Sequence, residues 1–243
     1  MKEQLLITCY HHVGVPPSGA PHRRTWVSGP HLARHLELLV RCGYSFQTVS
    51  DALARPQGRR ACITFDDGFA DVMQALPVLT AFGATATFYV VTDEIGRQDR
   101  EWDGGARTQF ATEAHLTRLA EAGWEIGSHA DTHVRLAGQS ASQQHERLAR
   151  SRARLERVLG TAPSSLAYPY ASYDAETVKA ARAVGFTSAV RLAGGFNGAQ
   201  ADRLQLNRIS LCGHRFWEHL ERLKLYSTHR GWYPRHQRPA LCA

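Results

Sequence analysis

Short apolar runs alternate with longer segments of helical periodicity along most of the chain. The runs have the length of buried strands, and the longer segments repeat apolar residues every three or four positions, as amphipathic helices do. In the segment that opens at Pro30 and ends before Gly43, for instance, Leu32, Leu36 and Leu39 lie on one helical face. This alternation predicts an α/β fold.

The expected strands and helices follow one another in repeated strand–helix units. The strands are expected at residues 5–10, 44–49, 61–65, 86–91, 124–127, 165–168, 187–190 and 206–211. The helices are expected at 30–42, 70–82, 113–122, 142–159 and 175–184, and a glycine stands directly after each, as a left-handed cap requires. Such units predict a parallel sheet or a barrel, with its chemistry at the carboxyl ends of the strands.

The chain has 243 residues, of which 43% are hydrophobic, so it can bury the core of one large domain. We expect residues 1–213 to form this domain, and residues 214–243 to form a C-terminal extension with a helix and a basic tail. No run approaches the roughly 20 apolar residues that a membrane-spanning helix needs. The apolar run at 5–10 is too short and too close to Met1 for a secretory signal, so we expect a cytoplasmic protein.

The formal net charge of +7 raises the question of an anionic partner. The basic residues are scattered, and two clusters stand out: residues 147–157, where Glu156 interrupts a run of arginines on an expected helix, and the tail at 230–238. We interpret the first as a solvated helix face and expect no nucleic-acid partner. Peripheral contact of the tail with an anionic membrane stays open. The five cysteines form no CxxC pair, which argues against a disulfide framework or a thiolate zinc site.

The sequence TFDDG places two neighbouring carboxylates, Asp66 and Asp67, directly after the expected strand at 61–65. A buried carboxylate needs a cation or a proton to offset its lost hydration. One of the two can bind a metal while the other stays free as a base. A cap on the helix that begins near Ala70 explains the motif equally well.

The sequence SHADTH places His129 and His133 after the expected strand at 124–127. Histidine pairs with this spacing arise by chance in a chain with 13 histidines, and a second pair, His31 and His35, lies in an expected helix, where we expect a solvated face. Placement distinguishes the two pairs, because the first leaves a strand at the same edge as Asp67. Two imidazoles and one carboxylate are the usual ligands of a catalytic divalent metal with an open position for water.

Two further polar segments follow expected strands. In LAYPYASYD, at 166–174, a turn can direct the backbone N–H of Tyr170 into the site, although an ordinary turn explains the sequence as well. In CYHHVG, at 9–14, the side chains alternate, so we expect His11 and His12 to point to opposite sides and only one of them to face the mouth of a barrel. An ordinary core or surface histidine is the alternative for each.

Two long segments interrupt the strand–helix units: residues 92–110, which contain Trp102, and residues 191–204, which are rich in glycine. Long loops in compact domains are often the walls of binding sites, and surface insertions are the alternative. We take Trp102 and Tyr168 as candidate substrate-contacting residues.

Together, TFDDG, HADTH, AYPY and YHHVG resemble the polysaccharide deacetylase family, the NodB-homology carbohydrate esterases, over about residues 5–211. The YHHVG opening resembles the branch that includes biofilm poly-N-acetylglucosamine deacetylases. The resemblance implies a distorted (β/α) barrel of about seven strands. It also implies removal of N-acetyl groups from amino sugars with a divalent metal, most often Zn²⁺, with Co²⁺, Ni²⁺, Mn²⁺ and Fe²⁺ as alternatives.

The resemblance also implies residue roles. Asp66 corresponds to the catalytic base, His11 to the general acid, and the backbone N–H of Tyr170 to an oxyanion donor. The implied metal ligands are Asp67, His129 and His133.

This chain departs from the family pattern in two places. Many members have an arginine that orients the base where this chain has Ala167, and Arg208 is our candidate replacement, with an ordinary surface arginine as the alternative. The usual C-terminal Leu-x-His motif is missing, because His214 stands at the wrong spacing. This absence favours His11 as the general acid.

The expected function is therefore a metal-dependent N-deacetylase that acts on an amino-sugar-containing glycan or its biosynthetic intermediate. Water activated by the metal would attack the acetyl carbonyl, with an aspartate base and a histidine acid. A related metal-dependent C–N hydrolase, such as a deformylase or a cyclic amidase, is one alternative. A sugar-binding module with a decayed site is another.

Overall fold

The computed structural model describes residues 4–18, 20, 22–98, 100–102 and 107–211. The expected extension at 214–243 and His214 lie outside the described residues. The division of the chain near residue 213 therefore stays a prediction.

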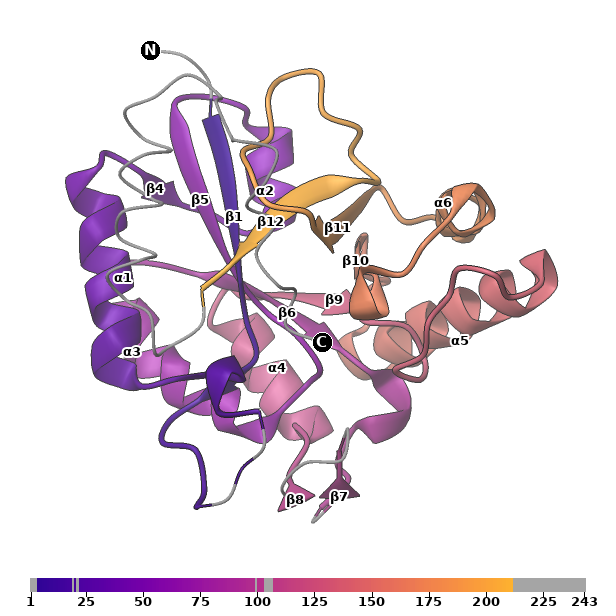
Figure 1. Ribbon diagram of the computed structural model, residues 1–243, viewed down its shortest axis with the longest axis horizontal. Coiled ribbons are helices and arrows are strands. Elements are labelled where there is room, and N and C mark those ends of the chain that lie inside the picture. Colours follow the sequence, from indigo (N-terminus) through magenta and orange to yellow (C-terminus); the bar gives the residue numbers. More distant parts are fainter. Residues whose placement is uncertain (1–3, 19, 21, 99, 103–106, 212–243) are drawn as a thin grey trace.

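Seven parallel strands form a closed barrel in the order β1-β12-β11-β10-β9-β6-β5, and β5 pairs back with β1 (Figure 1). Their bounds are Gln4–Tyr10 for β1, Arg59–Phe65 for β5, Ala86–Val90 for β6, Glu125–Ser128 for β9, Ser165–Ala167 for β10, Ser188–Leu192 for β11 and Leu206–Ser210 for β12. The barrel is distorted, because β1 and β5 pair along their whole length whereas β9 and β10 meet at the single pair Ser128 and Leu166. The expected seven-stranded distorted barrel is confirmed.

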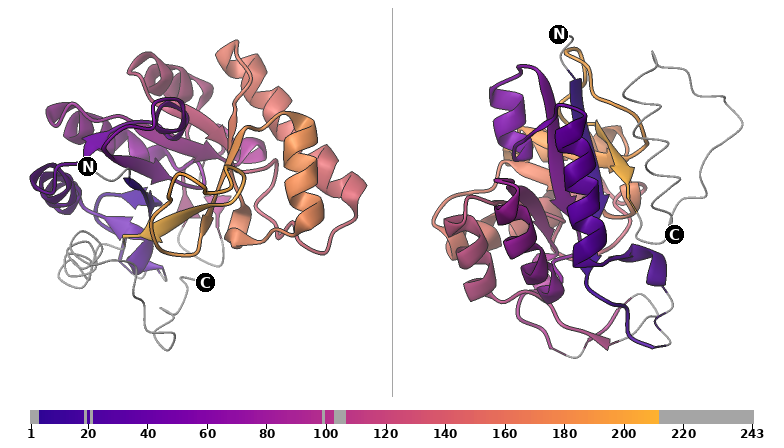
Figure 2. Two further views of the ribbon diagram at one scale, coloured as in Figure 1. Left: turned by 90° about the horizontal axis from the view of Figure 1, so that it is seen from above. Right: turned by 90° about the vertical axis from the view of Figure 1, so that its left-hand side faces the viewer.

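Helices surround the barrel (Figure 2). The α-helices are α1 Gly29–Arg41, α2 Val49–Ala54, α3 Ala75–Ala81, α4 Glu113–Glu121, α5 Ala141–Leu159 and α6 Ala175–Val184. Short 3-10 turns are η1 Arg23–Thr25, η2 Ala70–Gln74, η3 Thr92–Glu94 and η4 Pro169–Ala171, and the short strands are β2 His12–Val13, β3 Trp26–Val27, β4 Ser45–Phe46, β7 Arg100–Glu101 and β8 Arg107–Thr108.

Strand alternation separates the interior of the barrel from the layer beneath the helices. Leu5 and Ile7 of β1 belong to one buried cluster with Leu206 of β12. Leu6, between them, belongs to a second cluster together with Leu32 of α1. At the carboxyl end of each strand, the side chains that continue this inward alternation therefore point into the mouth of the barrel.

Two expected elements differ from the structure. The expected strand at 44–49 is reduced to β4, because the Thr48 hydroxyl accepts a hydrogen bond from the Asp51 backbone N–H and caps α2. The expected helix at 70–82 begins as η2 and becomes α-helical only at Ala75, near Pro77, whose ring and missing N–H disfavour a continuous helix through this position.

The expected solvated position of His35 is wrong. His35 is 1% exposed, and its Nδ1 lies 3.0 Å from the hydroxyl of Tyr10 on β1. The side of α1 that carries His35 therefore faces the barrel, and His35 belongs to the packing of a helix onto a strand. His31 is partly exposed, and its Nδ1 atom lies 3.0 Å from the Ser28 hydroxyl.

Candidate active site

The polar segments singled out in the sequence meet at one end of the barrel. Asp66 and Asp67 follow β5, His129 follows β9, and His11 follows β1. Backbone hydrogen bonds hold the ends of neighbouring strands together: the Asp66 N–H donates to the Tyr10 carbonyl, and the His129 N–H donates to the Val90 carbonyl. The carboxyl ends of these strands thus bring three distant parts of the chain into contact.

The strained backbone positions gather at the same end. Among the described residues, the non-glycine residues with positive φ are Asp67 (71°), Ala130 (61°), Tyr170 (55°) and Ala171 (51°). Such conformations cost on the order of 1–3 kcal/mol each, and they persist where surrounding contacts hold them. All four lie two to four residues after the end of β5, β9 or β10, so the strain lies where the sequence places its chemistry.

The geometry of Asp67, His129 and His133 fits a divalent metal. The Asp67 Oδ1 atom lies 3.4 Å from the Nε2 atom of His129 and 3.4 Å from the Nε2 atom of His133. Two ligand atoms that each lie about 2.1 Å from a tetrahedral zinc ion are about 3.4 Å apart. The observed separations match this spacing, and they exceed the usual 2.7–3.2 Å of an N–H···O hydrogen bond.

The orientation of His129 fits that of a metal ligand. Its Nδ1 atom lies 2.8 Å from the carbonyl oxygen of Ala167, which can only accept a hydrogen bond, so Nδ1 carries the proton. In the neutral imidazole, the Nε2 lone pair then points toward Asp67. This arrangement, in which one ring nitrogen donates to a carbonyl and the other is left for the ion, is typical of metal-binding histidines.

The electrostatics of the cluster favour a cation. Burial raises the pKa of Asp67, but the positive field of His133, His129 and His11 outweighs it and holds this pKa well below its usual range. Burial lowers the pKa of His129, but Asp67 and Asp66 outweigh it and raise this pKa above its usual value. The site thus stabilises the negative charge of the Asp67 carboxylate and a positive charge next to that carboxylate.

Arg208 lies against Asp66, as proposed for the missing family arginine. Its Nη1 and Nη2 atoms lie 2.6 Å from the Oδ1 and Oδ2 atoms of Asp66, and the two side chains are 1% and 3% exposed. Burial raises the pKa of Asp66, but Arg208 and then His129 outweigh it, so the pKa is lowered. The surface-arginine alternative is wrong, because this guanidinium is buried and bidentate.

Sequence reasoning missed Cys9 as a neighbour of Asp66. The Cys9 Sγ atom lies 3.5 Å from Asp66 Oδ2, and one donor atom each of Cys9, His11 and Asp66 lies within 4.8 Å of the other two. This group has the composition of a second metal site. However, the guanidinium of Arg208 already binds the Asp66 carboxylate, so its positive charge would repel a metal ion at this position. Strand alternation could have predicted this position of Cys9, because Leu5, Ile7 and Cys9 lie on the same face of β1.

The structure separates the roles of His11 and His12. His11 lies beside Asp66, whereas the ring of His12 stacks between Trp26, at a centroid distance of 4.2 Å, and Phe69, at 3.7 Å. The His12 Nδ1 atom also lies 2.6 Å from an Asp71 carboxylate oxygen. Of the two, His11 is therefore the histidine beside the Asp66 carboxylate, and His12 is held in a packing role.

Aromatic rings flank His133. The Trp102 ring lies 5.2 Å from the His133 ring, and the Tyr170 ring lies 4.2 Å from it. Tyr170 is 37% exposed, and the Arg135 guanidinium lies 4.9 Å above its ring. Trp102 is half-buried, so both rings present apolar surface next to the cluster.

Tyr168 does not reach the site, which removes it from the expected substrate-contacting residues. It is 1% exposed, its hydroxyl donates to the Leu204 carbonyl, and its ring stacks on Tyr173. The physical reason is the period of two along β10, which puts Tyr168 in the same buried cluster as Leu166, outside the barrel.

Comparison with known proteins identifies the class of the chain. The family model described as "Polysaccharide deacetylase" matches residues 54–189. The chain belongs to the polysaccharide deacetylase family. Membership makes it a hydrolase of the deacetylase class and implies an acetylated sugar as substrate.

Individual relatives agree with this assignment. The chain is 27% identical to YxkH of Bacillus subtilis over 201 residues, which cover 78% of this chain and 68% of that protein. The deacetylase PplD of Streptococcus pyogenes, solved in complex with acetate, superposes with a TM-score of 0.76 at 23% identity, over 93% of this chain and 99% of that one. IcaB of Ammonifex degensii superposes with a TM-score of 0.77 at 24% identity, over 91% and 97% of the two chains. These two superpositions show a shared fold.

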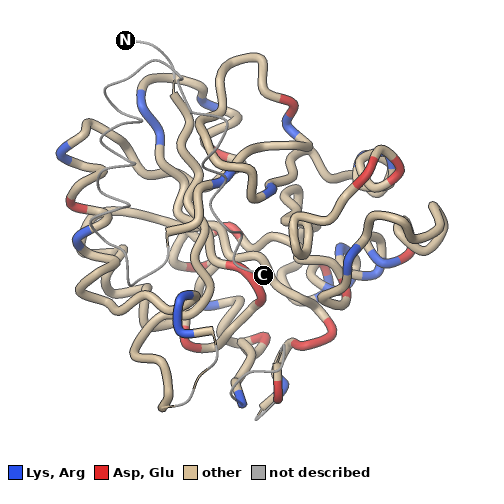
Figure 3. The backbone as a smooth tube through the Cα atoms, in the orientation of Figure 1, with Lys and Arg blue, Asp and Glu red and all other residues tan. Residues whose placement is uncertain are grey.

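Two observations bear on partners. Figure 3 shows Lys and Arg spread over several elements of the described chain and interleaved with Asp and Glu. The expectation of no nucleic-acid partner stays a prediction. Within the described part of the chain, none of the helices has the length and apolarity that a bilayer crossing requires.

Proposed function

We propose that the protein is a metal-dependent carbohydrate N-deacetylase, with Asp67, His129 and His133 as the metal ligands. The observation that carries this proposal is the pair of 3.4 Å separations between Asp67 Oδ1 and the two histidine Nε2 atoms, next to an ionised Asp66. The bound ion, for which Zn²⁺ is our first choice, would polarise the acetyl carbonyl and make water acidic enough to react near neutral pH.

Asp66 is the base in this mechanism. Its low pKa keeps it ionised, and the bidentate contact with Arg208 fixes the plane of the carboxylate so that it can accept a proton from the attacking water. Asp66 is the neighbour of the ligand Asp67 and is not itself required for the metal. Arg208 positions Asp66 and does not touch the reacting atoms.

Tyr170 and His11 complete the mechanism. The backbone N–H of Tyr170, held at a positive φ of 55°, would donate to the negative oxygen that develops as the carbonyl is attacked. His11 would donate a proton to the departing nitrogen. An amine leaves poorly unless it is protonated, so a positioned acid favours N-acetyl over O-acetyl substrates.

The rings of Trp102 and Tyr170 are proposed to contact the amino-sugar substrate. They lie on the same histidine ligand, His133, and expose apolar faces beside the metal cluster. A glycan with an N-acetylated hexosamine, or a biosynthetic intermediate that carries one, fits such a surface. A cytoplasmic location stays our prediction from the sequence.

The proposal is tested by metal analysis combined with acetate release from an N-acetylglucosamine oligomer. We expect an equimolar amount of divalent metal, acetate release that a chelator abolishes, and recovery on addition of Zn²⁺. Hydrolysis of formamides or cyclic amides without acetate release would indicate a different C–N hydrolase. Metal binding or sugar binding without any turnover would indicate a decayed binding module.

His11→Ala is expected to lower kcat for an N-acetylated sugar by about 10²–10⁴-fold while the metal content stays unchanged, because a general acid is lost and no ligand is. The matched variant is His12→Ala, which should lower the unfolding temperature and leave kcat close to that of the wild type. Both are measured by acetate release and metal analysis. If His12→Ala is the variant with the large loss of kcat, His11 is not the acid.

A further inference from the structure

Asp131 is a buried carboxylate between the two histidine ligands that the mechanism above does not use. It is 0% exposed, and it stands two residues after His129 and two residues before His133. An ionised carboxylate buried to this extent is costly unless cations and hydrogen bonds compensate it. The groups that contact Asp131 therefore show what holds the segment between His129 and His133 in place.

Two arginines of α5 compensate Asp131. The Arg147 Nη1 atom lies 3.2 Å from its Oδ1 atom, and the Arg150 Nη2 atom lies 2.8 Å from its Oδ2 atom. The two arginines are three positions apart on the helix, so they lie on one face. The Thr132 N–H donates to Asp131 Oδ1 at 2.6 Å, and the Thr132 hydroxyl accepts from Arg147 at 2.7 Å.

The backbone around Asp131 is tied to the loop after β6. The Asp93 N–H donates to the Asp131 carbonyl at 2.9 Å, and the Thr92 N–H donates to the Ala130 carbonyl at 3.2 Å. Ala130 has a φ of 61°, a conformation that surrounding contacts must maintain. The ion pairs and these hydrogen bonds together fix the segment that runs from one histidine ligand to the other.

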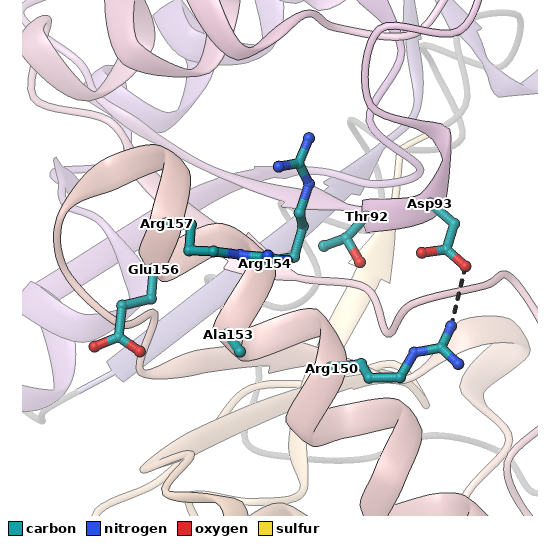
Figure 4. Close-up of a pocket in the computed structure, with 7 residues that line it drawn as sticks. All are labelled: Thr92, Asp93, Arg150, Ala153, Arg154, Glu156 and Arg157. Carbon is teal, nitrogen blue, oxygen red and sulfur yellow. Dashed lines mark hydrogen bonds and ion pairs between the residues drawn. The ribbon is translucent and has the colours of Figure 1, made fainter.

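Arginines on this face of α5 form ion pairs with carboxylates of the same chain. A hollow of about 630 Å³ lies along α5, and Arg150 and Arg154 line it (Figure 4). Arg150 contacts Asp93 as well as Asp131, and Arg154 pairs with Glu113. Two of the three arginines at the hollow, Arg150 and Arg154, thus have carboxylate partners, and the third is Arg157. Arg150 joins the partly exposed ion pairs of this face to the buried Asp131.

We propose that Asp131 is a positioning residue for the metal site: through Arg147 and Arg150 it fixes the loop from His129 to His133 and so sets the affinity of the site for its ion. His129 is also held by its hydrogen bond to the Ala167 carbonyl. We therefore expect Asp131 to affect mainly the position of His133. This inference rests on the proposed metal site. It does not depend on which acetylated sugar is the substrate.

The experiment compares apoprotein of the wild type, Asp131→Asn and Asp93→Asn in a titration with Zn²⁺ against a chromophoric chelator. Residues that orient ligands typically change metal affinity by 10–100-fold, so we expect Asp131→Asn to bind Zn²⁺ about tenfold more weakly. Asp93→Asn removes the other carboxylate from the same guanidinium, and we expect it to bind as the wild type does. The visible absorption of the Co²⁺-loaded proteins should change for Asp131→Asn alone.

A carboxylate that only stabilises the fold gives a different result. In that case Asp131→Asn would lower the unfolding temperature of the apoprotein, and the folded variant would keep the Zn²⁺ affinity and the Co²⁺ spectrum of the wild type. That outcome overturns the proposal, as does an equal loss of affinity in Asp93→Asn. A wild-type protein that does not compete with the chelator would instead refute the metal site itself.

Arg147→Gln provides a second variant if Asp131→Asn does not fold. Arg147 lies on a helix face and its side chain is 29% exposed, so its replacement is easier for the fold to accept. It should weaken Zn²⁺ binding in the same direction and by a smaller factor than Asp131→Asn. An unchanged affinity in folded Arg147→Gln would overturn the assigned path from α5 to the loop.

Discussion

Asp66→Asn is expected to lower kcat for deacetylation by about 10²–10⁴-fold without loss of metal, because it removes the proposed base and leaves all three proposed ligands in place. Asparagine has nearly the same shape as aspartate but cannot accept the proton from water. The measurement is acetate release at saturating substrate together with the metal content of the same sample. Full activity in a folded, metal-loaded Asp66→Asn protein would remove Asp66 from the role of base.

The same change has a cost in stability that needs its own control. It leaves the buried Arg208 without its anion, and breaking a buried ion pair on one side costs about 3–5 kcal/mol. The double variant Asp66→Asn/Arg208→Gln removes both charges, so it should recover part of the stability and none of the activity. Asp51→Asn is the matched surface control, since Asp51 is 50% exposed on α2, and it should keep both.

His129→Ala is expected to abolish stable metal binding, and acetate release with it. Outer residues that only orient ligands change affinity by about 10–100-fold, so loss of a direct ligand should exceed about 100-fold. The buried Asp67 would also lose a positively polarised neighbour, which raises its pKa toward the usual value. Metal analysis after dialysis, and Zn²⁺ titration of the apoprotein, measure the effect.

The control for this change is His145→Ala, on the exposed face of α5. It removes a histidine of the same chemistry far from the cluster and should leave the metal content at the wild-type level. An unchanged metal content in His129→Ala would exclude His129 as a ligand. Equal losses in both variants would mean that the bound metal is not at the barrel mouth.

The barrel could be predicted from the sequence because apolar residues are spaced differently in its strands and in its helices. Most of β5 reads as a short apolar run, with Ala61, Cys62, Ile63 and Phe65. Helix ends are marked by glycine, as at Gly160 after α5 and Gly185 after α6, both in the left-handed conformation. The prediction was wrong at 44–49, where a run of strand-forming residues continues into α2. There the cap at Thr48 overrides the β propensity of Val49.

The candidate site could be predicted as far as strand ends determine it. Asp67 and His129 meet because parallel strands of a barrel finish at one edge, which follows from the order of elements alone. Contacts that depend on side chains between distant strands could not be derived in this way. The bidentate contact of Arg208 with Asp66 was only a candidate from the family pattern, and the network of Asp131 joins a loop to a helix with no sequence signature.

The contact between Arg208 and Asp66 has a consequence for how the protein is made. Residue 208 lies on β12, which inserts between β11 and β1 and completes the cylinder. A nascent chain lacks this strand until nearly the whole barrel has left the ribosome, so its Asp66 has no guanidinium to hold it. Closure of the barrel and pairing of Asp66, the proposed base, with Arg208 both require β12. A chain that ends before this strand is therefore expected to lack deacetylase activity.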